Sequence, residues 1–228
     1  MKKLYTLLAL TIGFSMNAQM DDNSANNNSA GDFAVAMGYG TTASGNVSTA
    51  MGSGTTASGY VSTAMGNSTA SSLYSTAMGY QTTASGIAST SMGDSSTASG
   101  HYSTAMGLQT TASGAYSTSM GSFTTASDFA STVIGQCNSS GSSVTNNATS
   151  FSTSNTAFVI GNGTDPSNKS DAFKVMFNGD ATVSNDLTVS GDVVISSDAR
   201  LKSNIVSLGS TLPKLLQIDG KSYEMKGK

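Results

Sequence analysis

Residues 48–61 read Ser-Thr-Ala-Met-Gly-Ser-Gly-Thr-Thr-Ala-Ser-Gly-Tyr-Val, one unit of the repeat that decides the fold. The Met-Gly pair of this unit recurs every 14 residues, with a single interval of 13, at Met37, Met51, Met65, Met78, Met92, Met106 and Met120. Ile134-Gly135 continues the series, and the one-residue deletion is expected near Ser71. A fixed period of this kind is typical of solenoids, in which each repeat adds one coil.

The spacing inside a unit predicts β-strands. Two short runs, Ser48 to Met51 and Thr55 to Ser58, alternate along the chain and are followed by glycine, which favours strand and turn in succession. A helix is disfavoured because each glycine costs it about 1 kcal/mol relative to alanine. Within Ser-Thr-Ala-Met, Ser and Ala share one face of a strand, and Thr and Met share the other. We therefore expect Ser and Ala to line a thin roll, with the Met row free to pack on a neighbouring chain.

Composition agrees with a thin, stacked structure. Of 228 residues, 42 are Ser, 29 are Thr and 25 are Gly, whereas 10% are charged and 7% aromatic. Average domains contain about 25% charged residues. The net charge of -3 and the 37% hydrophobic content argue against disorder. No Lys or Arg occurs from Leu4 to Asn168, which excludes nucleic acid as a partner of this stretch, since phosphate binding needs basic residues.

The N-terminus resembles a secretory signal peptide. Lys2 and Lys3 precede an apolar run, Leu4 to Phe14, which is too short to span a bilayer and ends in small and polar residues. Cleavage is expected after Ala18, so residues 1–18 are assigned to the signal and residues 19–32 to a linker. The mature chain is expected to be secreted or on the cell surface, without a transmembrane segment. Cys137, the single cysteine, is expected to be a small buried residue, with a free thiol or an interchain bond left open.

The units Ser48–Gly52 and Thr55–Gly59 resemble the head repeat of trimeric autotransporter adhesins, the YadA-like left-handed β-roll. The resemblance covers residues 33–136, with Thr and Met where that family usually has Val or Ile. It implies a left-handed parallel β-roll solenoid of 14-residue coils that assembles as a homotrimer. Because seven coil intervals of roughly 4.8 Å give about 34 Å, the expected shape is a rod.

Other interpretations of the array differ in what they require. A calcium-binding β-roll needs acidic residues, and Asp94 and Asp128 alone occur between Phe33 and Gly135. An ice-binding surface would use the Thr pairs, but adjacent residues of a strand point to opposite faces, so each pair offers one ranked hydroxyl per coil. A passive spacer requires only stacking. The spacer and an adhesive surface are left as alternatives.

Aromatic residues fill the variable positions of the repeat. Tyr60, Tyr74, Tyr102 and Tyr116 are candidates for an exposed track that stacks on sugars, although packing between coils explains them equally. The partner would then be a glycan or a host-surface protein. His101, the only histidine, has no metal-ligating neighbours at useful spacing and reads as a surface substitution. No cofactor or metal is expected.

The array gives way to a different pattern after Gln136. Residues 137–156 read as a linker or neck, and residues 157–196 as a β-rich stalk with Asn162-Gly163 and Asn178-Gly179 as turns. The expected strands are Ala157–Ile160, Ala172–Phe177, Ala181–Val183, Leu187–Val189 and Asp192–Ser196.

The stretch Ser197-Asp198-Ala199-Arg200-Leu201-Lys202-Ser203-Asn204-Ile205 resembles the start of the intramolecular chaperone of phage endosialidases and tailspikes, a self-cleaving serine peptidase domain. The resemblance implies that Ser197 is the nucleophile, Lys202 the proton acceptor and Ser197-Asp198 the bond cleaved. A lysine can act as a base only where burial lowers its pKa. Residues 197–228 would be a truncated chaperone domain, a short α/β remnant.

The chain is therefore predicted to be an exported, all-β, trimeric fibre with an adhesin-like head for surface attachment, assembled through the C-terminal chaperone segment. A self-processing serine peptidase and a passive spacer remain as alternatives, and enzymatic activity, at most autoproteolytic, is left open.

Overall fold

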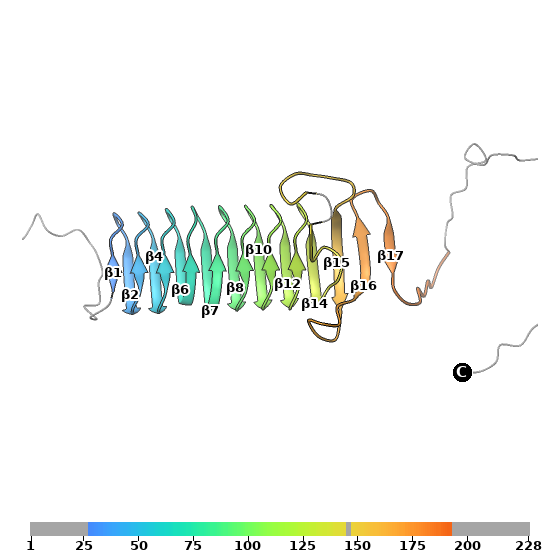
Figure 1. Ribbon diagram of the computed structural model, residues 1–228, viewed down its shortest axis with the longest axis horizontal. Coiled ribbons are helices and arrows are strands. Elements are labelled where there is room, and N and C mark those ends of the chain that lie inside the picture. The colour runs from blue at the N-terminus through green and yellow to red at the C-terminus, as the bar shows by residue number, and fades with distance from the viewer. Residues whose placement is uncertain (1–26, 145–146, 193–228) are drawn as a thin grey trace, which may run out of the picture. The chain divides into compact units, whose positions relative to one another are not determined.

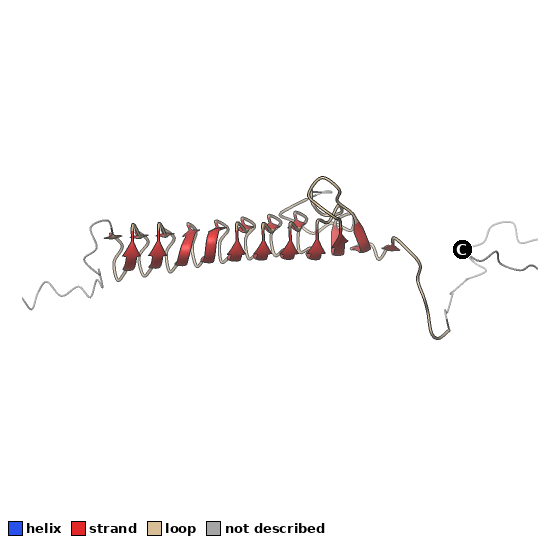
Figure 2. Cartoon of the chain, turned by 90° about the horizontal axis from the view of Figure 1, so that it is seen from below, coloured by secondary structure: helices blue, strands red, loops and turns tan. Residues whose placement is uncertain are grey.

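The computed structural model describes residues 27–144 and 147–192, so the expected signal peptide and the chaperone segment lie outside the described residues. The chain divides into one unit ending at Asp186 and a second beginning at Leu187. In the described part of the first unit, short strands follow one another as coils stacked along one axis (Figure 1). The described residues form strands, turns and loops without a helix (Figure 2), as the all-β prediction requires.

Each coil contains one long and one short strand. The long strands are β2 (Val35–Tyr39), β4 (Thr49–Ser53), β6 (Thr63–Ala70), β7 (Thr76–Ala84), β8 (Thr90–Asp94), β10 (Thr104–Leu108), β12 (Thr118–Ser122) and β14 (Thr132–Gln136). The short strands are β1 (Asn28–Ser29), β3 (Thr42–Ala43), β5 (Thr56–Ala57), β9 (Thr97–Ala98), β11 (Thr111–Ala112) and β13 (Thr125–Ala126). The C-terminal halves of β6 and β7 take the place of short strands.

Successive coils pair in parallel and in register, which confirms a parallel β-solenoid. Thr104 lies opposite Thr90 and Thr118, and Met106 opposite Met92 and Met120. Equivalent side chains therefore form columns along the roll, and every strand edge inside the stack is paired.

The interior is filled by the smallest apolar side chain. The inward column consists of alanines that are fully buried, with Ser91 and Ser119 replacing alanine in two coils. The hydroxyl of Ser91 donates to the carbonyl of Ser96, so these substitutions are satisfied. Larger buried side chains enter this column at Val133 and Val159, at the C-terminal end. The expected small face is therefore the core.

Glycine is required where the long strands turn away from the stack. Gly107 has φ +130, and a Cβ built on it would lie 2.0 Å from the carbonyl oxygen of Gly121 in the next coil. Gly38, Gly52, Gly79, Gly93 and Gly121 have the same geometry. The second glycine of the repeat, such as Gly100, is also required, because its Cβ would lie 2.1 Å from the carbonyl oxygen of Gly114.

The deletion in the repeat lies earlier than its expected position near Ser71. Asn67 pairs with Tyr80 and Ser68 with Thr82, so Gln81 has no counterpart in the shorter coil. The residue missing from the shorter coil therefore corresponds to Gln81, which has a left-handed backbone in the next coil, and β6 continues through this position without a break. The side-chain amide of Asn67 donates to the carbonyl of Ser53 at 2.8 Å and bridges the shortened turn to the preceding coil.

Both ends of the roll extend past the predicted limits. β1 lies inside the expected linker, where Asn28 pairs with Thr42, so the roll begins before Phe33. At the other end, β15 (Thr156–Asn162) adds one more parallel strand beside β14, with Phe158 opposite Thr132. The 25 residues between these partners include the loop formed by residues 139–155, part of which is described.

Asn138 ends the short-strand sheet without adding a strand. Its Oδ1 accepts from the backbone N–H of Thr125 at 2.8 Å, and its Nδ2 donates to the carbonyl of Thr125 at 2.9 Å. The side-chain amide thus makes the two hydrogen bonds that the backbone of a further coil would have made.

An antiparallel hairpin closes the long-strand sheet. β16 (Asp171–Met176) pairs with β15, and β17 (Ala181–Val183) pairs with β16. Asn162 is the last residue of β15 and Gly163 begins the first connection, whereas Asn178-Gly179 lies in the second, where Gly179 has φ +93. The expected strand Leu187–Val189 is wrong, since these exposed residues form no strand. Most of the expected strand Asp192–Ser196 lies outside the described residues.

Candidate functional site: the aromatic turn edge

One line of turns carries most of the variable residues of the array. Each turn has two positions after the second glycine of the repeat, or after the residue that replaces it. A serine follows these positions in every turn but the first, where Ala34 follows, and we call the line of the two positions the turn edge. Position 1 is held by Asp32, Asn46, Tyr60, Leu73, Ile87, His101, Ala115 and Phe129, and position 2 by Phe33, Val47, Val61, Tyr74, Ala88, Tyr102, Tyr116 and Ala130.

Position 2 adopts a left-handed backbone without glycine. Tyr102 has φ +58 and Val61 φ +53, conformations that are rare for β-branched and bulky residues. A ladder of hydrogen bonds compensates this strain, because each position 2 N–H donates to the position 1 carbonyl of the preceding coil. The N–H of Tyr102, for example, donates to the carbonyl of Ile87 at 2.8 Å. Stacking therefore imposes the turn conformation on whichever side chain is present.

The four predicted tyrosines are exposed and form two separate groups. Tyr60 and Tyr74 contact edge to face, with ring centroids 5.9 Å apart. Tyr102 and Tyr116 are stacked at 5.0 Å, and Phe129 packs against Tyr116 at 5.4 Å. Each tyrosine is about half exposed, so packing between coils and an open ring surface occur together. Ile87 and Ala88 separate the groups, which sequence spacing did not reveal.

The loop after Asn138 lies against part of this edge. The carbonyl of Ala148 accepts from the N–H of Ala115 at 2.8 Å, and the carbonyl of Asn147 accepts from the N–H of Phe129 at 3.2 Å. Nothing in the repeat predicts this contact, because residues 139–155 lack its periodicity.

Among the described residues, the contacts of His101 and Cys137 are with the protein fold and do not form a binding or catalytic site. Nδ1 of His101 accepts from the N–H of Ile87 at 3.3 Å, and the side chain is exposed. The thiol of Cys137 is buried and free, as expected for a small core residue. Within residues 27–144 and 147–192, no group of three or more acidic, histidine or cysteine side chains could hold a metal ion.

The outer faces of the two sheets differ. The long-strand sheet presents a Thr column beside the half-buried Met column. The short-strand sheet presents a single Thr column, because the first threonine of each pair, such as Thr110, is buried while the second, Thr111, faces outward. Each pair therefore contributes one outward hydroxyl per coil.

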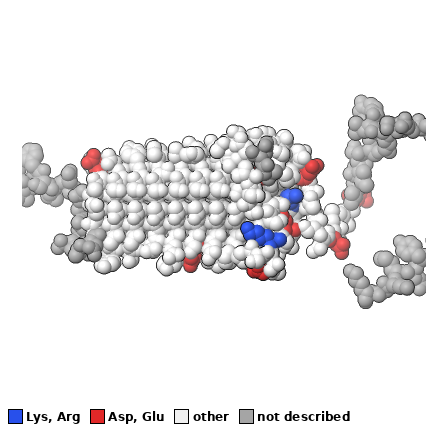
Figure 3. Space-filling view, in the orientation of Figure 1, with Lys and Arg blue, Asp and Glu red and all other residues white. Residues whose placement is uncertain are grey.

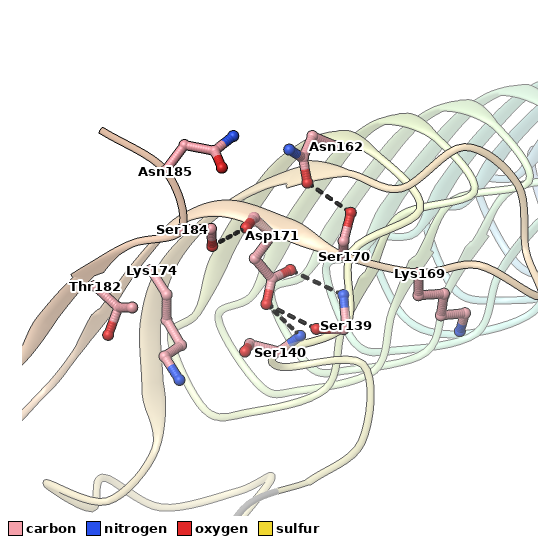
Figure 4. Close-up of a pocket in the computed structure, with 10 residues that line it drawn as sticks. All are labelled: Ser139, Ser140, Asn162, Lys169, Ser170, Asp171, Lys174, Thr182, Ser184 and Asn185. Carbon is pink, nitrogen blue, oxygen red and sulfur yellow. Dashed lines mark hydrogen bonds between the residues drawn. The ribbon is translucent and has the colours of Figure 1, made fainter. Parts of the chain in front are cut away.

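A polar depression of about 510 Å³ lies beside the terminal hairpin and was not predicted (Figure 4). Asp171 on β16 organises its wall: the carboxylate accepts from the backbone N–H groups of Ser139 and Ser140 and from the Ser139 hydroxyl, each within 2.9 Å. Lys169 and Lys174 also line it. Figure 3 shows the basic side chains, in blue, gathered at the hairpin end of the roll, whereas the visible face of the coils is almost uncharged. Asp171 holds the loop to the hairpin, a structural role.

Asp165 lies in the turn before the depression. The side-chain amide of Asn168 and then the N–H of Ser167 donate to its carboxylate and lower its pKa. The lowered pKa means that the carboxylate stays charged to a lower pH than an unbonded aspartate, so these bonds weaken only when the pH falls through that lowered pKa.

The proposed catalytic residues Ser197, Asp198 and Lys202 lie outside the described residues. The part of the chain with described coordinates contains no helix long and apolar enough to cross a membrane.

Comparison with known families matches this array to the YadA head domain repeat. The family model describes two copies of the repeat, and its matches cover residues 29–55, 43–69, 70–96, 84–110 and 98–124. No match crosses from residue 69 to residue 70, in the coil that is one residue short. A search of curated proteins found no match. Residues 29–124 are therefore YadA-type head repeats, as the resemblance of the units Ser48–Gly52 and Thr55–Gly59 implied.

Proposed function

We propose that this protein is an exported, trimeric, adhesin-like fibre whose YadA-type head attaches a surface to a glycan or a host-surface protein. The observation that carries the proposal is the in-register stack of head repeats with exposed aromatic rings along one edge. A passive spacer would need the stack but has no use for half-exposed tyrosines at strained turn positions, where a small residue such as Ala88 suffices. Signal-peptide features at residues 1–18 support export.

Attachment is tested with beads coated with residues 19–228 and applied to glycan arrays and immobilised surface proteins. We expect retention on at least one surface, and a fall of about tenfold for Tyr102→Ala with Tyr116→Ala, because their stacked rings supply the apolar contact area. Tyr80→Ala is the matched control, since Tyr80 is equally exposed in the turn after the Met-Gly pair. Retention on no surface, or equal retention of all variants, would favour the spacer.

Trimer formation is proposed to use the Met column of the long-strand sheet. The column is apolar, continuous from Met37 to Met120 and half-buried in the isolated chain, so packing against two other copies would remove it from water. The Thr and Met columns of this face carry no formal charge, and Asp94, at the end of β8, is the one charged residue of these seven long strands.

Charges placed in the Met column are expected to abolish the trimer. Met78→Asp with Met92→Asp would bury two carboxylates per chain, at a cost of several kcal/mol. Sedimentation analysis should show a trimer for the unmodified chain and a monomer for this variant. Thr83→Asp with Thr97→Asp, on the outward column of the short-strand sheet, is the control and should remain trimeric. A monomeric unmodified chain would contradict the assembly.

Assembly is proposed to involve the C-terminal segment, and the motif Ser197–Ile205 is the observation in favour. If the segment also cleaves itself, Lys202 takes the hydroxyl proton of Ser197 as the oxygen attacks the carbonyl carbon of a Ser197–Asp198 bond. That bond breaks, Lys202 passes the proton to the leaving amine of Asp198, and water hydrolyses the ester. Mass spectrometry of the purified chain is then expected to find a fragment ending at Ser197, which disappears in Ser197→Ala. A chain that keeps its full mass contradicts cleavage and leaves the fibre proposal intact.

A further inference from the structure

The N–H groups at position 1 of the turn edge form a column of hydrogen-bond donors, one from each coil. The position 2 N–H groups donate to position 1 carbonyls, and the N–H of the following serine donates to the glycine carbonyl of its own turn, as Ser103 does to Gly100. Neither set of bonds involves the position 1 N–H groups. Each position 1 donor therefore needs an acceptor from elsewhere, or water.

These donors have acceptors in four coils. Two acceptors are side chains of the next coil, Asn46 Oδ1 for the N–H of Asp32 and His101 Nδ1 for the N–H of Ile87. The other two are the carbonyls of residues 147 and 148 described above. Within residues 27–144 and 147–192, the N–H groups of the remaining position 1 residues have no protein acceptor: Asn46, Tyr60, Leu73 and His101.

The loop formed by residues 139–155 shows what the position 1 donors bind when a polypeptide segment lies beside them. Where Asn147 and Ala148 lie on it, two successive peptide carbonyls meet the donors of two adjacent coils, and Ala115 is only 6% exposed. At the uncovered coils, Tyr60 is 48% and Leu73 46% exposed. The same edge is therefore covered by polypeptide at its C-terminal end and open toward its N-terminal end.

We propose that the open part of the turn edge, from Asn46 to Tyr102, binds a bent segment of a partner polypeptide through these backbone donors, as the loop does at Asn147 and Ala148. The proposal deepens the adhesive function and rests on it. Partner carbonyls accept from the N–H groups of Tyr60 and Leu73, as those of the loop accept from Ala115 and Phe129. Apolar side chains of the partner pack on the rings of Tyr74 and Tyr102.

The chemistry of the edge defines the partner. Coils repeat at roughly 4.8 Å, whereas the carbonyls on one side of an extended strand recur every second residue, about 6.6 Å apart, so a strand does not match the donors. A bend that turns two successive carbonyls to one side, as at Asn147 and Ala148, does match them. Main-chain hydrogen bonds of this type give affinity with little dependence on sequence, and selectivity comes from side-chain contacts. Between Asn46 and Tyr102 the only charged side chain is Asp94, in the turn after the Met-Gly pair, so an uncharged, aliphatic or aromatic segment fits best. Two of the four acceptors on this column are side chains of the next coil, and the two that come from outside the stacked turns are peptide carbonyls, which favours polypeptide over glycan.

The test begins with selection of a phage-displayed library of random peptides on the full chain. Enriched peptides are synthesised and titrated against Tyr74→Asn with Tyr102→Asn. Asparagine tolerates the left-handed backbone, so the substitution removes the rings and keeps the fold, which circular dichroism verifies. We expect affinity to fall about tenfold or more, whereas Tyr80→Asn on the opposite turns leaves it within about twofold. Hydrogen exchange of residues 59–75 should slow when peptide binds, because the Tyr60 and Leu73 amides gain acceptors.

Several results would overturn the proposal: no enriched peptide, peptides that bind the edge variant equally well, or binding without slower exchange at residues 59–75. Binding of glycans alone would replace the partner class, and self-association lost only in the edge variant would assign the edge to a second copy. Beads that attach to surfaces while no peptide is selected would sink this inference and leave attachment standing. Peptide binding by a chain whose beads attach to no surface would support this inference and contradict the attachment proposal.

Discussion

Replacing Gly107 by alanine is expected to destabilise the roll by more than about 3 kcal/mol. Two effects add at this position. The backbone has φ +130, which residues with a Cβ rarely adopt, and that Cβ would lie 2.0 Å from the carbonyl oxygen of Gly121. Neither atom is at the end of a flexible side chain, so relief requires the two coils to separate. Because coils contact only their neighbours, the damage concentrates at one interface.

Thermal unfolding followed by circular dichroism, at one protein concentration, measures this loss, and limited proteolysis is expected to cut near residues 93–121. Gly40→Ala is the matched control, because φ is +62 and the new Cβ would lie 3.9 Å from its nearest neighbour. Its expected cost is the left-handed strain alone, about 1 kcal/mol. Equal melting temperatures for the two variants would refute the close-approach argument.

Enlarging the interior is expected to be comparably damaging. Ala105 is fully buried between Ser91 and Ser119 of the adjacent coils and belongs to a cluster with Ala98 and Ala112. Overpacking costs typically about 1–3 kcal/mol, and Ala105→Leu should reach or exceed the upper value, since hydrogen-bonded ladders on both sides prevent the sheets from moving apart.

Urea denaturation of Ala105→Leu should show a lower midpoint than that of the unmodified chain. Thr104→Leu introduces the same side chain one residue earlier, on the outward face, and is expected to change stability by less than about 1 kcal/mol. If both variants unfold at one midpoint, the interior has more room than an alanine core implies.

The repeat predicted the stack, its faces and its glycines because these depend on spacing within one unit. The inward Ala column and outward Met column follow from alternation along a strand, and both appear as expected. The predicted position of the deletion was wrong because a sequence of Ser, Thr and Ala can be aligned equally well with the missing residue near Ser68 or near Ser71. Only pairing between coils distinguishes them.

The aromatic edge was predicted by residue type but not by geometry. Periodicity places Tyr60 and Tyr102 at variable positions, yet ring pairing depends on which of two turn positions each tyrosine occupies. The contact of Ala148 with Ala115 joins residues far apart in the chain through backbone atoms, which leaves no trace in side-chain patterning. The two hydrogen bonds of the Asn138 side chain to the backbone of Thr125 likewise could not be predicted from side-chain patterning.

The in-register columns have a genetic consequence. Since each coil presents nearly the same Thr, Ala, Met and Gly to its neighbours, removing residues 49–62 would join Ser48 to Thr63 and restore every pairing across the junction. Unequal recombination between units can therefore lengthen or shorten the head by whole coils, roughly 4.8 Å at a time, without any compensating substitution. The reach of the fibre can thus change by copy number while its two ends stay the same.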